Sequence, residues 1–312
     1  MVAAWLRDLA SSVAVASFKM YLAGIRYHQI LCGFPWMLDG DEQVRRMLRF
    51  LKRKFPGSAK AAKVPVTLGV LRAIFPLLAG WPDARCMSHD DRLFVAASLV
   101  AVAGFLRGGE FLSSRKSDRP ILTAALVRIV RIEGSLAVRV SIRQPKAMWW
   151  VEAQDVPCFA RKEAPSFCPV LWWDSFSSLS PKFVRASELG RLSSLPAFHR
   201  ASGAPLSRDW MVGRTSELMA GAGIEIKDAA GKPSSVKASS WRAGGVRSAA
   251  NALISGPTIK LLGRWSSDAW ESYLMESARD LLRASQQMWK AACEGVCGSV
   301  RLWVGEASEV SA

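Results

Sequence analysis

Histidine and clustered cysteine are scarce in this sequence. Its three histidines, His28, His89 and His199, are far apart along the chain. Of the six cysteines, only Cys293 and Cys297 are near neighbours, and they lack the second pair that a zinc site requires. The sequence therefore gives no support for a metal site, and reduced thiols in an intracellular protein are expected.

Long apolar runs are also missing. The longest, from Leu93 to Leu106, is interrupted by Ser98 and falls short of the roughly 20 residues that cross a bilayer. It predicts a buried helix. The first residues also lack the charged and apolar segments of a secretory signal. We therefore expect no membrane partner.

Acidic residues are outnumbered by basic ones. The chain has 42 Lys and Arg against 26 Asp and Glu, a formal net charge of +16. This balance indicates an anionic partner, with nucleic acid the first interpretation, an anionic membrane surface the second, and a generically basic surface the alternative to both.

The imbalance is strongest between Gln43 and Pro82, where no acidic residue occurs. A charged helical face is usually a solvated one, but such faces normally mix signs. We therefore predict phosphate contacts for the basic side chains of this region: Arg45, Arg46, Arg49, Lys52, Arg53, Lys54, Lys60 and Lys63.

Apolar periodicity predicts helices in the first third of the chain. Residues 11–32 form the first, and a second begins at Asp41 and turns its apolar residues away from the basic face. After a basic linker, Thr67 caps a third. Residues 90–113 are expected to form one long apolar helix that ends with the segment around Arg107.

The middle of the chain predicts strands. β-Branched residues in 127–132 and 136–142 flank a Glu133-Gly-Ser135 turn, which is typical of a hairpin, and 151–156 can add a third strand. From Cys168 onward the pattern is helical again, with Pro, Gly and Ser in the loops. The predicted fold class is mostly α with a small antiparallel sheet.

One tyrosine stands out near the C-terminus. No tyrosine occurs between Tyr27 and Tyr273, and Tyr273 follows a Leu-Gly-Arg-Trp run that contains Trp265. A phenol has an ordinary pKa of about 10, so it is a useful nucleophile only where another group removes its proton and nearby groups stabilise the developing charge. Arginines such as the nearby Arg242 are natural clamps for a phosphate under attack.

This arrangement resembles the tyrosine recombinase, or phage-integrase-like, family, and is closest to members found in eukaryotic mobile elements. The resemblance rests on the run Leu262-Gly-Arg-Trp-Ser-Ser-Asp268, on Arg107 followed three residues later by Glu110, and on two upstream segments: Ile142-Arg-Gln-Pro-Lys146 and Phe167-Cys-Pro-Val170. It covers the chain from about Ala16 to about Tyr273.

The resemblance implies a two-domain DNA clamp. We expect part of a helical DNA-grasping domain at residues 1–57, a basic linker at 58–63, the integrase-like catalytic domain at 64–290 and a tail at 291–312. It also implies duplex DNA as partner, self-association on DNA, such as a tetramer, and a nuclear location.

The implied reaction is DNA recombination or integration through a 3′-phosphotyrosine, without metal, ATP or another cofactor. Tyr273 is the expected nucleophile. Arg107 and Arg242 would hold the non-bridging phosphate oxygens, Lys146 would protonate the leaving oxygen, and Trp265 would donate its indole N–H to the phosphate.

One position departs from the family pattern. The second arginine box, usually His-x-x-Arg, is Ser239-Ser-Trp-Arg242 here, and serine cannot accept a proton near neutral pH as histidine can. The alternative to an enzyme is therefore a catalytically degenerate DNA-binding relative. Taken singly, the residues also have plainer interpretations: Arg107 pairing with Glu110, and Trp265 packing in the core.

Overall fold

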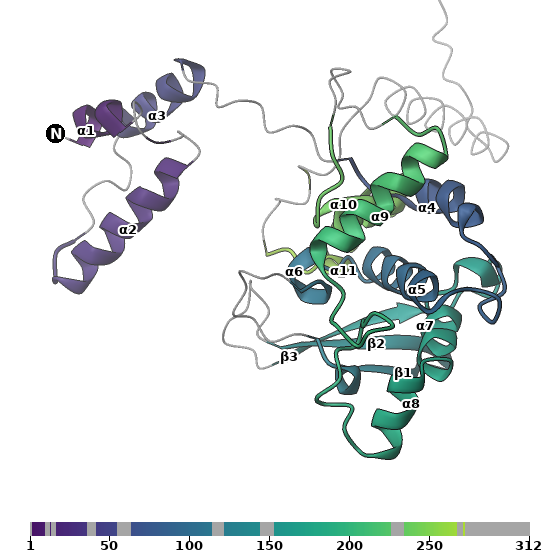
Figure 1. The fold of residues 1–312 in the computed structure, drawn as a ribbon. Helices are drawn as coiled ribbons and strands as arrows, with labels where there is room; N and C mark the ends of the chain where they lie inside the picture. The colour runs from purple at the N-terminus through teal and green to yellow at the C-terminus, as the bar shows by residue number, and fades with distance from the viewer. Residues whose placement is uncertain are drawn as a thin grey trace, which may run out of the picture. The chain divides into compact units, whose positions relative to one another are not determined.

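The computed structural model describes residues 2–9, 13, 17–35, 42–54, 64–113, 122–143, 153–225, 234–266 and 271. The chain forms two compact units, an N-terminal unit of residues 1–62 and a C-terminal unit of residues 63–312 (Figure 1). None of the described helices is long and apolar enough to span a membrane.

Three helices make up the described part of the N-terminal unit: α1 (Val2–Leu9), α2 (Phe18–Leu31) and α3 (Glu42–Lys54). A small core joins them, consisting of Leu6, Phe18, Val44 and Leu51. The predicted second helix is thus confirmed as α3, which contributes Val44 and Leu51 to this core.

The first predicted helix was wrong at its start. It was expected from residue 11, but α2 begins at Phe18 and Val13 lies in a bend. The side chains of Tyr21, Ile25 and Ile30 are exposed rather than buried. The apolar spacing of this segment therefore predicted a helix correctly but did not predict which of its side chains are buried.

The C-terminal unit begins with helices around a large core. Thr67 caps α4 (Leu68–Ile74), its side-chain Oγ1 accepting a hydrogen bond from the Val70 N–H at 3.2 Å. A single 3-10 turn, η2 (Phe75–Leu77), follows. The long apolar helix is α5 (His89–Ala103), and nearly all its side chains from Leu93 to Val102 are fully buried.

The predicted extent of that helix, to residue 113, was wrong. α5 ends at Ala103, and two residues later Phe105 has a left-handed backbone with φ of 49°, which cannot continue a right-handed helix. A separate short helix, α6 (Gly108–Phe111), starts after Arg107. The apolar composition continues across this break because both sides of it enter the core, so composition alone did not reveal it.

The sheet has three antiparallel strands in the order β1 (Val127–Ile132), β2 (Ser135–Arg143) and β3 (Ala153–Phe159). A two-residue turn joins β1 and β2, and both of its residues, Glu133 and Gly134, have positive φ. Such turns match the twist of the strands they connect. The hairpin and the fold class are confirmed; the third strand lies slightly later than expected.

Further helices complete the unit. They are η3 (Ala124–Leu126), η4 (Pro165–Phe167), α7 (Pro169–Ser178), α8 (Pro181–Glu188), α9 (Arg208–Gly221), α10 (Ser240–Asn251) and α11 (Gly256–Leu262). Pro169 occupies the first turn of α7, where its missing N–H is not needed. The main core lies between the sheet and α5, α7, α9 and α10 (Figure 1).

Two adjacent glycines allow α10 to pack tightly. A Cβ on Gly245 would lie 2.6 Å from the Val102 carbonyl oxygen of α5, and a Cβ on Gly244 would collide with the Val66 carbonyl. The backbone of α10 therefore lies directly against two other segments. This contact fixes the position of Arg242, which lies in the same helix.

We predict that Gly244→Ala lowers the free energy of unfolding by up to about 2 kcal/mol. Inserting a methyl group into a packed interior costs about 1–3 kcal/mol, which outweighs the gain of about 0.5–1 kcal/mol from replacing glycine within a helix. Gly213→Ala in α9 is the matched control, because no atom lies within 4 Å of its added Cβ. Urea denaturation should show the two substitutions acting in opposite directions; equal effects would contradict the packing account.

Candidate active site

Arg107 stands at the start of α6 and is tied to that helix by Glu110. Its Nη1 donates to Glu110 Oε1 at 2.9 Å, and its backbone N–H donates to Glu110 Oε2 at 2.7 Å. The expected pairing of these two residues is thus confirmed. The Arg107 side chain nevertheless keeps 24% of its surface exposed.

Glu110 has a second arginine partner from a distant segment. Arg264 Nη2 lies 2.8 Å from Glu110 Oε2, and both side chains are only 5% exposed. Arg264 Nη1 also donates to the Gly104 carbonyl at 3.1 Å. Burial lowers the pKa of the Arg264 guanidinium below its ordinary value, and the Glu110 carboxylate opposes this shift. One buried carboxylate therefore joins two arginines that are far apart in sequence.

Arg242 joins the same segments through their backbones. Its Nη1 donates to the Phe105 carbonyl at 2.7 Å and its Nη2 to the Gly263 carbonyl. The residue is 2% exposed. Its guanidinium carbon lies 3.9 Å from the ring centroid of Trp265, a cation–π contact. In this structure Arg242 acts as a brace between the turn after α5 and the turn after α11.

Both braced turns have an unusual backbone. Phe105 and Arg264 have φ of 49° and 58°, in the left-handed region that side chains rarely adopt. Such conformations persist where surrounding contacts hold them, and they concentrate at functional sites. Here the contacts are those of Arg242 and Arg264 with the carbonyls of residues 104, 105 and 263.

The ring of Trp265 fills the space beside these turns. It meets the ring of Phe105 edge to face, with centroids 6.4 Å apart. A Cβ on Gly263 would collide with the Trp265 ring, so glycine is required two residues before the indole. Phe105 and Trp265 pack with α10 and α11 in a small apolar cluster. Trp265 is only partly buried, and it packs against this small cluster rather than in the main core.

Ser239 lies at the N-terminal end of α10, one turn before Arg242. It is half-buried. The segment before it is close to the first arginine box, since a Cβ on Gly108 would lie 2.5 Å from the Cβ of Ala238. Ser239 therefore belongs to the same neighbourhood as the start of α6.

The structure brings together four of the predicted site residues: Arg107, Ser239, Arg242 and Trp265. Their catalytic roles stay predictions. Tyr273 and Lys146 lie outside the described residues.

Arg264 and the second role of Glu110 were missed from the sequence. The only signal was a basic residue next to Trp265, and its partner is 154 residues away.

The predicted phosphate-binding helix is α3. Arg45, Arg46 and Arg49 are exposed, as expected for such a role. Glu42, at the start of the helix, lies 3.4 Å from Arg46 Nε and 2.6 Å from Arg49 Nη2. Lys54 lies 5.7 Å from the ring centroid of Phe50. Phosphate contact by this face stays a prediction; Lys60, Lys63 and the side chains of Lys52 and Arg53 lie outside the described part of the chain.

Metal ligands do not gather in the parts of the chain that the structure describes. Within them, no group of three or more His, Cys, Asp or Glu side chains is placed to hold an ion. The two described buried thiols, Cys158 and Cys168, are free. Burial raises the pKa of Cys158 to about 12, so this thiol is unreactive near neutral pH.

No family model matches the chain, and no curated protein matches it. Solved structures of integrases are similar to it. One is a lambda integrase dimer bound to a COC′ core site, with 14% sequence identity, 86% of this chain and 82% of that chain covered, and a TM-score of 0.42. Another is the Tn1549 transposon integrase in complex with transposon right end DNA, with 12% identity, 90% and 87% covered, and a TM-score of 0.40.

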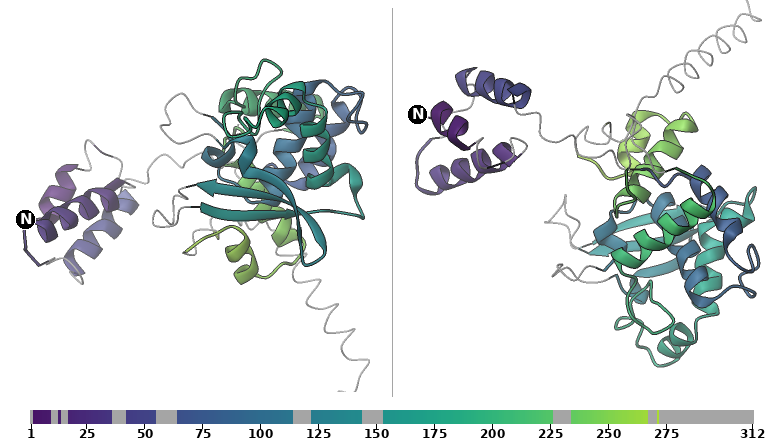
Figure 2. Two further views of the ribbon diagram at one scale, coloured as in Figure 1. Left: turned by 90° about the horizontal axis from the view of Figure 1, so that it is seen from below. Right: turned by 45° about the horizontal axis from the view of Figure 1, so that its top comes forward.

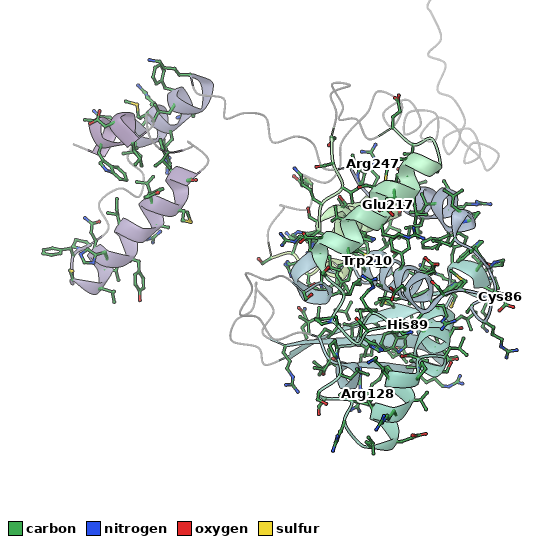
Figure 3. The ribbon with its side chains drawn as sticks, in the orientation of Figure 1. Cys86, His89, Arg128, Trp210, Glu217 and Arg247 are labelled. Atoms are coloured by element: carbon green, nitrogen blue, oxygen red, sulfur yellow. The ribbon has the colours of Figure 1, made fainter. Side chains whose placement is uncertain are left out.

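We predict that Glu110→Gln destabilises the C-terminal unit by about 3–5 kcal/mol, because removing one partner of a buried ion pair leaves the other charge uncompensated. Glu217→Gln on α9 is the matched control (Figure 3): Glu217 is 68% exposed and lies 3.5 Å from Arg214 Nη1. Its loss should cost less than about 1 kcal/mol. Denaturant unfolding measures both; equal losses would show that Glu110 does not hold the site together.

Proposed function

We propose that this protein is a tyrosine recombinase that cuts and rejoins duplex DNA, with Tyr273 as nucleophile. The observation that supports the proposal best is the convergence of three arginines, Arg107, Arg242 and Arg264, from three distant segments. They meet around the turn that leads, nine residues after Arg264, to the isolated tyrosine. A membership among eukaryotic mobile elements is part of the proposal and rests on the Leu-Gly-Arg-Trp run.

The three arginines differ in exposure, and we assign their roles accordingly. Arg242 and Arg264 are buried and bind backbone carbonyls and Glu110, so they shape the site. Arg107 is the most exposed of the three, and its Nη1 is oriented by Glu110. A guanidinium held in this way is suited to bind a non-bridging phosphate oxygen without reorganising during the reaction. Arg107 is therefore the proposed phosphate clamp.

The proposed reaction balances without an external energy source. The Tyr273 oxygen attacks phosphorus, the bond from phosphorus to the 5′ oxygen breaks, and the phenol proton passes to solvent or a nearby acceptor. The 5′ oxygen takes a proton from Lys146 and leaves as a hydroxyl. Since the phosphotyrosine retains the energy of the broken bond, a 5′ hydroxyl can reverse the step on the same or another strand. Exchange between two duplexes requires self-association on DNA.

A second candidate function is a DNA-binding module that has lost turnover. Ser239 favours it, because the family pattern has a histidine there and a hydroxyl cannot accept the phenol proton near neutral pH. Both candidates share the basic composition and the braced arginines. They differ in one observable, the covalent protein–DNA adduct.

The direct test uses a pool of nicked duplexes of varied sequence, in which cleavage releases a short strand and traps the adduct. Wild-type protein is expected to form an adduct that survives denaturing electrophoresis. Tyr273→Phe should abolish it while duplex affinity stays within about twofold, because only one hydroxyl is removed. Tyr21→Phe is the matched control, since that phenol is exposed in the N-terminal unit. An adduct that persists in Tyr273→Phe would refute the assigned nucleophile.

Ser239→His is expected to raise the cleavage rate. An imidazole that titrates near pH 6.5 can accept the phenol proton, and a positioned acid–base group contributes on the order of 10²–10⁴ in rate. The gain is limited by fit, since Ser239 is half-buried. Single-turnover cleavage measures the effect. If wild type and Ser239→His both bind the pool and neither forms an adduct, the binding-module function replaces the enzyme.

A further inference from the structure

The sheet places two arginines directly opposite each other. In the register of β1 and β2, Arg128 is the cross-strand partner of Arg139. Directly opposed side chains have Cβ atoms about 4.5–5.5 Å apart, and like charges in such pairs are destabilising. Arg128 is held in place because its Nε donates to the Ala125 carbonyl at 2.9 Å. Two like charges at directly opposed positions conflict with the usual pairing preference of a sheet. Such conflicts are expected chiefly at functional positions.

These arginines lie on the outer face of the sheet. Side chains alternate along a strand, and Val127, Val138, Val140 and Val156 of the other face are buried in the main core. α5 and α7 contact the sheet on that inner face. Viewed from below, the three strands lie in front of the helices (Figure 2, left), and Arg128 lies at the lower side of the sheet (Figure 3).

The basic character continues along the outer face. Arg143, at the end of β2, is exposed and lies on the same face as Arg139 because four residues separate them. Arg191 is exposed and immediately precedes Leu192, whose carbonyl accepts a hydrogen bond from the Ala125 N–H at 3.2 Å. Arg191 therefore comes from the segment beside Arg128.

One acidic residue lies on this face among the described side chains of the sheet. Asp155 accepts a hydrogen bond from Ser141 Oγ at 2.5 Å and lies 3.7 Å from Arg139 Nη1. The Arg139 contact is long, and both side chains are substantially exposed, at 39% and 51%. An exposed pair of this kind contributes little and does not neutralise the row.

We propose that the outer face of the sheet, through Arg128, Arg139 and Arg143, binds the phosphate backbone of duplex DNA beside the cleavage site. The proposal rests on the proposed function, because it places this second contact on the same DNA. The row ends three residues before Lys146, the predicted proton donor.

The spacing of the row suits a phosphate backbone. Arg139 and Arg143 are four residues apart on one strand, about 13 Å at about 3.3 Å per residue. DNA carries one phosphate per about 3.4 Å of helix axis on each strand, so a row of this length can contact more than one phosphate. Guanidinium groups bind phosphate through paired hydrogen bonds, and a phosphate between Arg128 and Arg139 would relieve their repulsion.

The test is the salt dependence of duplex binding. Each lost phosphate contact reduces the slope of log affinity against log salt by about 0.9. The double variant Arg128→Gln with Arg139→Gln should therefore lower the slope by about 1.8. Arg128→Lys with Arg139→Lys keeps both charges and should retain the wild-type slope.

The matched control is Arg131→Gln with Arg85→Gln, which removes the same net charge. Arg131 is exposed but lies on β1 at the opposite face, and Arg85 is exposed in the loop before α5. If the control lowers the slope as much as the Arg128 and Arg139 pair, or if that pair leaves it unchanged, the proposal is wrong. Should the double glutamine variant lose its near-ultraviolet circular dichroism, Arg143→Gln at the strand end replaces it, with an expected decrease of about 0.9.

The outcome is separable from that of the proposed function. If the wild-type protein binds duplex and forms the adduct but the variants show no change in slope, only the proposed sheet contact is rejected. If the variants show the predicted changes in slope but the wild-type protein never forms an adduct, only the proposed recombinase reaction is rejected. Wild-type protein that does not bind duplex at all overturns both.

Discussion

The buried guanidinium of Arg242 is the contact on which the candidate site depends. It holds the carbonyls of Phe105 and Gly263, which belong to turns more than 150 residues apart in sequence, and it lies against the ring of Trp265. Neutral hydrogen bonds across a surface contribute little, but charged donors to buried carbonyls contribute more, and leaving those carbonyls unsatisfied costs free energy. Two strained turns are thereby fixed at one place in the fold.

This brace in turn determines what Arg107 can do. The turn at Phe105 sets the start of α6, and Glu110 then orients the Arg107 guanidinium from one side while Arg264 occupies the other carboxylate oxygen. An arginine placed by two levels of buried contacts needs little reorganisation to bind a phosphate. All three residues are arginines, so their different roles follow from burial: Arg242 and Arg264 are buried and shape the site, whereas Arg107 is accessible to a phosphate.

The sequence predicted elements well where a local pattern decided them. The hairpin was recognisable because Glu133 and Gly134 supply the turn, and Thr67 marks a helix start by local chemistry. The break after Ala103 was missed, because the apolar pattern runs through it and the cause, a left-handed Phe105 held by a distant arginine, is tertiary. Arg264 was missed for the same reason.

The central claim, that Tyr273 forms a bond to DNA in a site organised by these arginines, is tested most directly by mass spectrometry of the trapped complex. After protease and nuclease digestion, the account predicts a nucleotide mass on the peptide that contains Tyr273, and its absence after Arg107→Ala in protein that still folds. A nucleotide on another peptide, or an equal yield without Arg107, would contradict it.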